Sequence, residues 1–138
     1  MIRIESNDWL TVLSSATNSI LVLDDESDIV TIFKKSLELV GYTVSGFTDA
    51  ILALEHYRVN SDKYSMIISD IRMPNITGVD FADTVRKINQ LVKIILISAF
   101  DMKVLQISES LHITETIQKP VLPSKLNAIV SKHLETTR

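Results

Sequence analysis

The stretch MIISDIRMPN, from Met66 to Asn75, starts with an apolar run that stops on the carboxylate of Asp70. The run around Ser65–Ser69 is rich in isoleucine, as expected for a buried strand of a parallel sheet. Pro74 follows four residues after Asp70 and prevents the strand from continuing. The sequence therefore predicts a central strand that carries one carboxylate at its carboxyl end.

Similar short runs recur along the chain, and a stretch with helical spacing of apolar residues follows each of them. The predicted strands are Ile20–Leu23, Tyr42–Phe47, Ser65–Ser69, Lys93–Ser98 and Ile113–Gln118. The apolar faces of the predicted helices fall within 29–40, 50–57 and 81–88, within a weaker stretch around 104–111, and in a last segment that Pro123 opens. Gly41 is placed to end the first helix, and Thr48 or Asp49 to cap the second.

Strict alternation of strand and helix favours a parallel sheet with helices on both faces, because each crossover connection returns over the sheet. The 138 residues are too few for an eight-stranded barrel. We therefore predict an α/β fold, a flavodoxin-like doubly wound sheet of five strands in the order 2-1-3-4-5. Ligands of such sheets bind outside the carboxyl ends of the strands, near the point where the strand order reverses.

The first 19 residues stand apart from this regular pattern. In one interpretation they form a short helix with Trp9 on its apolar side, which docks on the domain or on a second copy. In the interpretation that we favour, they are a partly ordered extension or an expression remnant. We expect one domain over residues 20–136 and an N-terminal extension over residues 1–19.

The composition excludes several classes of protein. The chain contains no cysteine, so disulfides and thiolate metal sites are ruled out. Its net charge is −3 and it has no dense stripe of lysine and arginine, so we expect no direct binding to nucleic acid. It has neither an apolar run of membrane-spanning length nor a signal peptide, so we expect a cytoplasmic protein without a membrane partner.

Polar residues fall at the ends of four different predicted strands. Asp24 and Asp25 follow the first strand, Asp70 ends the third, Ser98 ends the fourth, and Lys119 follows the fifth. Taken singly, each has a plain structural explanation; the first two acids, for example, could cap the helix that follows. Together they predict three carboxylates, one hydroxyl and one ammonium at the same edge of the sheet.

Carboxylates this close repel one another unless positive charge intervenes. Lys119 offsets one negative charge, and a divalent cation would offset the rest. Oxygen ligands suit Mg²⁺ or Mn²⁺ rather than zinc, and Mg²⁺ commonly also binds a phosphate. The pattern is thus typical of a site for a phosphoryl group, in which in-line attack by a carboxylate would give an aspartyl phosphate.

Residues from about Ile20 to His133 resemble a response-regulator receiver domain of two-component signalling. The matching segments are LVLDDE, IISDIRMPNITGVDF, IILISA and IQKPV. The resemblance implies a phosphorylation-activated switch rather than an enzyme that acts on an external metabolite. The implied partners are a sensor histidine kinase or phosphotransfer protein, and a downstream target or a linked output domain. A homodimer through the fourth helix, fifth strand and fifth helix is a further implied option.

The resemblance also assigns roles to single residues. Asp70 would be the phosphoacceptor, and Ser98 and Lys119 would contact the phosphoryl group. Asp25 would ligate Mg²⁺ directly, Asp24 would hold it through water, and the backbone carbonyl of Arg72 would be a further ligand. The Lys119–Pro120 bond would be cis, which an X-Pro bond permits at low cost.

The chain departs from the family pattern at the fifth strand, where Thr116 occupies the position of a usual tyrosine or phenylalanine. The aromatic rotation that often accompanies activation cannot occur there. Phe100, bulky and apolar beside the site, would hinder the attacking water and predicts slow self-dephosphorylation.

Two alternatives compete with the switch. One keeps the fold without the chemistry, as a protein-interaction module that is never phosphorylated; the complete set of acids argues against it. The other is a hydrolase of the haloacid-dehalogenase type, but that family needs a second aspartate where this chain has Arg72. A dinucleotide-binding fold is excluded because no glycine-rich loop follows the first strand.

Overall fold

A computed structural model describes residues 18–99 and 107–134 of the chain. Its five parallel strands form one sheet in the order β2-β1-β3-β4-β5, which confirms the predicted flavodoxin-like fold. The strands are β1 (Ser19–Leu23), β2 (Thr43–Phe47), β3 (Tyr64–Asp70), β4 (Lys93–Ser98) and β5 (Glu115–Gln118). The helices are α2 (Ser27–Leu39), α3 (Ala50–Asn60), α4 (Gly78–Ile88) and α5 (Pro123–His133), with 3₁₀ turns η1 (Ser61–Lys63) and η3 (Glu109–Leu111).

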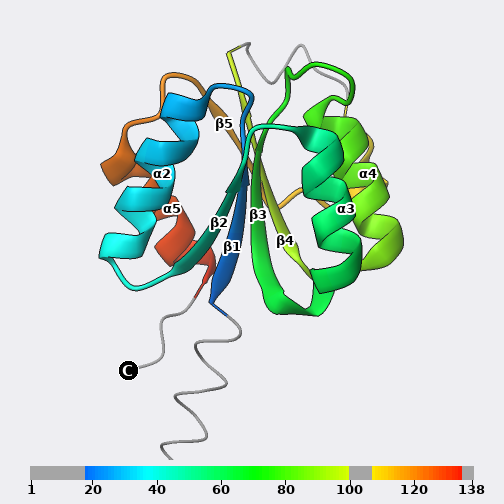
Figure 1. Ribbon diagram of the computed structural model, residues 1–138, viewed down its shortest axis with the longest axis horizontal. Helices are drawn as coiled ribbons and strands as arrows, with labels where there is room; N and C mark the ends of the chain where they lie inside the picture. The colour runs from blue at the N-terminus through cyan, green and yellow to red at the C-terminus, as the bar shows by residue number, and fades with distance from the viewer. Residues whose placement is uncertain (1–17, 100–106, 135–138) are drawn as a thin grey trace, which may run out of the picture.

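The sheet separates two hydrophobic cores. Successive side chains of a strand point to opposite faces, so Ile20 and Val22 pack with α2 and α5 while Leu21 and Leu23 pack with α3 and α4. Figure 1 shows the two pairs of helices on either side of the sheet. Because both faces are covered, the central strands β1 and β3 are buried along almost their whole length, which explains their apolar sequences.

Local signals in the sequence set several helix ends as predicted. Gly41 follows α2 with a φ of +106°, a conformation that costs glycine little. The Asp49 side chain accepts hydrogen bonds from the backbone N–H groups of Ile51 and Leu52 and so caps α3. Pro123 is the first residue of α5.

Four of the predicted strands differ from the structure by at most one residue at either end, and two predicted elements differ by more. Strand β5 begins at Glu115, two residues later than predicted. Of the predicted fourth helix, the part near Val104 lies outside the described residues, and the rest is only the single 3₁₀ turn η3. The Ser108 hydroxyl accepts the N–H of Ser110, and His112 adopts a left-handed φ of +50°, so the turn is closed at both ends.

The predicted N-terminal extension lies outside the described residues, except that Asn18 is described and Ser19 already belongs to β1. Helix α2 has 13 residues, whereas a membrane span needs about 20. In residues 18–99 and 107–134, no helix has the length and apolar character needed to cross a membrane.

Candidate functional site

Three carboxylates meet at the carboxyl ends of β1 and β3. Asp24 and Asp25 directly follow β1, and Asp70 is the last residue of the neighbouring strand β3. Each of the three offers an oxygen within 4.8 Å of the others'. Asp24 and Asp70 are only 2% and 6% exposed, while Asp25 faces solvent. The site is therefore a cluster of two buried acids and one exposed acid, and we name these three residues the acidic pocket.

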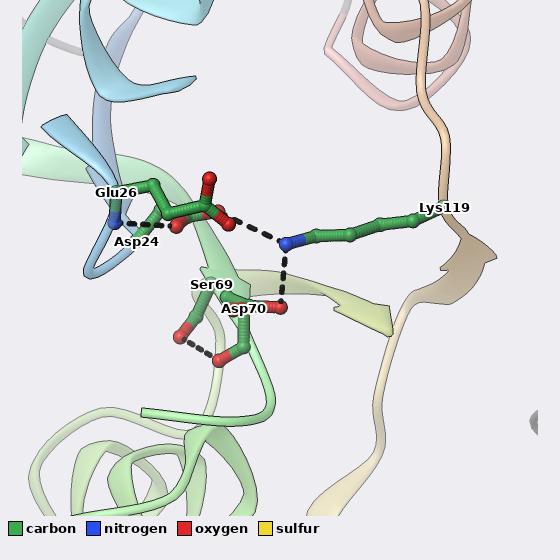
Figure 2. Close-up of polar contacts among 5 residues, drawn as sticks. All are labelled: Asp24, Glu26, Ser69, Asp70 and Lys119. Atoms are coloured by element: carbon green, nitrogen blue, oxygen red, sulfur yellow. Dashed lines mark hydrogen bonds and ion pairs between the residues drawn. The ribbon is translucent and has the colours of Figure 1, made fainter. Parts of the chain in front are cut away.

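The ammonium group of Lys119 lies between the two buried acids. Its Nζ is 3.5 Å from Oδ2 of Asp24 and 3.3 Å from Oδ1 of Asp70. Figure 2 shows both contacts as dashed lines. The Lys119 backbone N–H donates to the carbonyl of Ser98 at 2.7 Å, which fixes the start of this loop to the end of β4. The Lys119–Pro120 bond is cis, as the resemblance implied. The fold thus brings the positive charge of Lys119, which is distant in the sequence, next to the acids.

One lysine does not balance the negative charge of the pocket. Burial and, after it, the charge of Asp24 raise the pKa of Asp70, Lys119 opposes both effects, and the net result is a pKa of about 6. Burial also raises the pKa of Asp24, against the lowering effects of the Glu26 N–H and of Lys119. For Lys119, burial alone would lower the pKa, but the two aspartates outweigh it and the net change is upward. The pocket is short of positive charge.

The donor set fits a hard divalent cation. All three side chains offer carboxylate oxygens, the ligands that Mg²⁺ and Mn²⁺ prefer, and the cluster contains neither histidine nor cysteine. A divalent ion would supply the charge that Lys119 leaves uncompensated. The plain alternative for the acids, that their side chains cap α2, is not what the structure shows. Glu26 is the N-cap without a side-chain hydrogen bond, and Asp24 accepts the Glu26 N–H ahead of the helix.

The remaining predicted residues have different positions. Ser98 ends β4 and is buried beside this edge of the sheet. Arg72 follows Asp70 by two residues and is exposed; the part assigned to its carbonyl stays a prediction. Thr116 is exposed on β5. Phe100, on which the prediction of slow dephosphorylation depends, lies outside the described residues.

Two contacts on the backbone of Asp70 were not predicted. The hydroxyl of Ser69 donates to the carbonyl oxygen of Asp70 at 2.9 Å. A Cβ added to Gly78 would lie 2.2 Å from that same oxygen, so α4 can begin this close to β3 only with glycine. The sequence held one signal for Ser69, because a polar residue within an apolar central strand needs a hydrogen-bond partner.

A sheet of order 2-1-3-4-5 with an acidic pocket and a lysine at its carboxyl edge defines the receiver class of flavodoxin-like proteins. Residues 20–131 match the family model of the response regulator receiver domain, and the chain belongs to this family. The resemblance seen in the sequence is thereby confirmed.

Two similar regulatory proteins support this membership. The phosphoglycerate transport system transcriptional regulatory protein PgtA of Salmonella typhimurium is 31% identical over 87% of this chain and 29% of its own length. The alkaline phosphatase synthesis transcriptional regulatory protein PhoP of Bacillus subtilis is 32% identical over 80% of this chain and 46% of its own. The chain thus spans less than half of either relative.

Among solved structures, the response regulator TrrA of Thermotoga maritima, determined in complex with Mg²⁺-BeF, superposes with a TM-score of 0.73. It is 31% identical, and the alignment covers 86% of this chain and all of TrrA. The likeness therefore extends over the whole of that receiver protein.

Proposed function

We propose that Asp70 accepts a phosphoryl group from a sensor histidine kinase or a phosphotransfer protein, with Mg²⁺ or Mn²⁺ in the acidic pocket. Receiver domains of response regulators serve phosphorylation-dependent signalling, and membership of this family supports the proposal. The observation that carries it is the place of Asp70, a buried carboxylate within 4.8 Å of two others and in contact with Lys119.

Each site residue has a part in the proposed transfer. An oxygen of Asp70 attacks the phosphorus, the bond from phosphorus to the donor nitrogen breaks, and its electron pair leaves with the donor. Lys119 and the Ser98 hydroxyl hold oxygens of the transferred group. Asp24, Asp25, Asp70 and the carbonyl of Arg72 would hold the metal ion. When bound, the ion offsets the negative charge of the acids and of the phosphoryl oxygens.

The domain acts only on itself in this proposal: it catalyses its own phosphorylation and dephosphorylation. The new charge on Asp70 shifts an existing equilibrium between two conformations, and the shift changes the surface seen by a downstream target or a linked output domain. The face that contains η3, β5 and α5 is the proposed output surface and a candidate for homodimer contact. The mildly acidic charge of the chain supports a protein partner rather than direct contact with nucleic acid.

Acetyl phosphate with Mg²⁺, followed by intact-mass measurement, tests the proposal. We expect the wild-type protein to gain the mass of one phosphoryl group and Asp70→Asn to gain none. Asp28→Asn, at an exposed acid in the first turn of α2, is the matched control and should behave as wild type. No gain for the wild-type protein would instead favour an interaction module that is never phosphorylated.

A further inference from the structure

Ser69 places a hydroxyl where the fold favours an apolar side chain. It is 0% exposed, and its neighbours at alternate positions, Ile67 and Ile71, belong to the core beneath α3 and α4. A buried hydroxyl is costly unless it forms a hydrogen bond. The hydroxyl of Ser69 donates to the carbonyl oxygen of Asp70, the next residue, as Figure 2 shows.

This hydrogen bond completes a set of contacts on the peptide group that follows Asp70. The other end of that peptide, the N–H of Ile71, donates to the carbonyl of Ile97 on β4 at 2.9 Å. The N–H of Gly78 donates to the Ile71 carbonyl at 2.8 Å, so the start of α4 is attached to the same turn of chain. The Asp70–Ile71 peptide is therefore held at its oxygen and at its nitrogen.

We propose that Ser69 is a positioning residue for the phosphoacceptor. Its hydroxyl fixes the peptide plane after Asp70, which keeps the carboxylate aimed at the pocket that Asp24 and Lys119 form. Reactions between groups held at short distance are sensitive to displacements of about 1 Å. This inference rests on the proposed phosphorylation of Asp70. It assigns a part in that reaction to Ser69, whose side chain lies on the opposite face of β3.

Three variants test the inference through the rate of phosphoryl uptake from acetyl phosphate with Mg²⁺. Ser69→Ala removes the donor, and we expect uptake to slow about tenfold at a temperature where the variant is fully folded. Ser69→Thr keeps the hydroxyl and should restore the rate to within about threefold of wild type. Ser65→Ala is the matched control on β3, because the Ser65 hydroxyl is buried without a hydrogen-bond partner among the described residues.

The rescue by threonine separates positioning from stability. Loss of stability alone would leave the rate of the folded protein unchanged in Ser69→Ala. Uptake by Ser69→Ala within about twofold of wild type, or slowed equally in Ser65→Ala, overturns the inference. If Ser69→Ala does not fold, Ser69→Cys replaces it, since a thiol is a weak donor of similar size; unchanged uptake there also overturns the inference. Failure of the wild-type protein to take up phosphoryl would refute the proposed function itself.

Discussion

Asp70 at the end of β3 and Arg86 on α4 are both ionisable and both buried, with 6% and 8% of their surfaces exposed. The guanidinium of Arg86 donates to four backbone carbonyls. They belong to Asn89, Val92, Leu111 and His112. The carboxylate of Asp70 instead contacts Lys119 and lies beside two further carboxylates.

Hydrogen bonds to backbone carbonyls satisfy the charged group of Arg86, whereas the surroundings of Asp70 oppose its ionisation. The carbonyls around Arg86 come from the loop before β4 and from the turn before β5, so this charge joins two loops to α4 and needs nothing from outside. At Asp70, burial and the neighbouring charge of Asp24 oppose ionisation. The ionised form of Asp70 is therefore destabilised in the folded protein. A bound cation, or removal of the charge on Asp70, would relieve this destabilisation. The comparison predicts opposite effects on stability when each charge is removed.

Arg86→Met should cause the largest effect. It leaves four carbonyls without their donor, and at about 1 kcal/mol for each hydrogen bond we expect the free energy of unfolding to fall by about 3–5 kcal/mol. Urea unfolding measures the loss. Arg58→Met, at an exposed arginine in the last turn of α3, should change stability by less than about 0.5 kcal/mol. A loss below about 1 kcal/mol for Arg86→Met would show that water replaces the guanidinium.

Asp70→Asn should stabilise the metal-free protein. The pKa of Asp70 rises from an ordinary 3.8 to about 6 on folding, so the folded state holds the proton more tightly. The resulting stability is present below the unfolded pKa and is lost as the pH rises through about 6. At about 1.36 kcal/mol per pH unit, the interval from 3.8 to about 6 limits the gain near pH 8 to about 3 kcal/mol.

Urea unfolding in a chelator at two pH values checks the sign. We expect the advantage of Asp70→Asn to shrink by about 2 kcal/mol between about pH 8 and about pH 4.5. Asp28→Asn, an exposed acid, should show no such trend. If Asp70→Asn destabilises the protein near pH 8, the pocket is not short of positive charge, and its contrast with Arg86 disappears.

Mg²⁺ should stabilise the wild-type protein by supplying the missing charge. At a concentration tenfold above its dissociation constant, we expect about 1.4 kcal/mol, measured by the shift of the urea midpoint. Asp25→Asn removes the exposed carboxylate of the cluster and should require a higher concentration for the same shift. Asp28→Asn should respond as wild type does. A shift that is the same in Asp25→Asn and wild type would place the ion elsewhere.

The sequence predicted the fold and the gathering of the three acids with Lys119 because their signals are local. Apolar runs located the strands, Gly41 and Asp49 marked helix ends, and strand order then brought the separated acids together. The errors fall where a local signal is weak. In the stretch before β5, Ser108 and His112 close a 3₁₀ turn where apolar spacing suggested a helix.

The hydrogen bonds of Ser69 and Arg86 could not be predicted from the sequence. Nothing in the sequence around Arg86 separates it from an exposed helical arginine, because two of its acceptors are 25 and 26 residues away. The hydroxyl of Ser69 donates to the carbonyl of the adjacent residue, Asp70. This hydrogen bond is of functional interest only because Asp70 is the proposed phosphoacceptor. Partners of buried polar groups follow from tertiary packing, which a single sequence does not display.

Replacement of Glu115 on β5 should have the smallest effect on stability. It serves as a reference for a charged contact that is partly exposed to solvent. Its Oε1 is 2.6 Å from Nε2 of His133 and 3.0 Å from Nζ of Lys132, both on α5. The hydrogen bond with His133, and after it Lys132, holds the pKa of Glu115 below its ordinary value, against the effect of burial. A depressed pKa contributes stability that is fully present above the unfolded value of about 4.5, and this contribution is lost as the pH falls from there through the lower pKa of the folded state.

We therefore expect Glu115→Gln to cost about 0.5–1 kcal/mol near pH 7 and the cost to fade below about pH 4, the reverse of the trend for Asp70→Asn. Urea unfolding across this range, with exposed Glu55→Gln as the control, measures both the size and the sign. Because the pair is partly exposed, added salt should weaken the effect, whereas the four carbonyl bonds of Arg86 should hardly respond. A cost as large as that of Arg86→Met would mean that attachment of α5 to β5, rather than burial, decides how much a charged contact stabilises this fold.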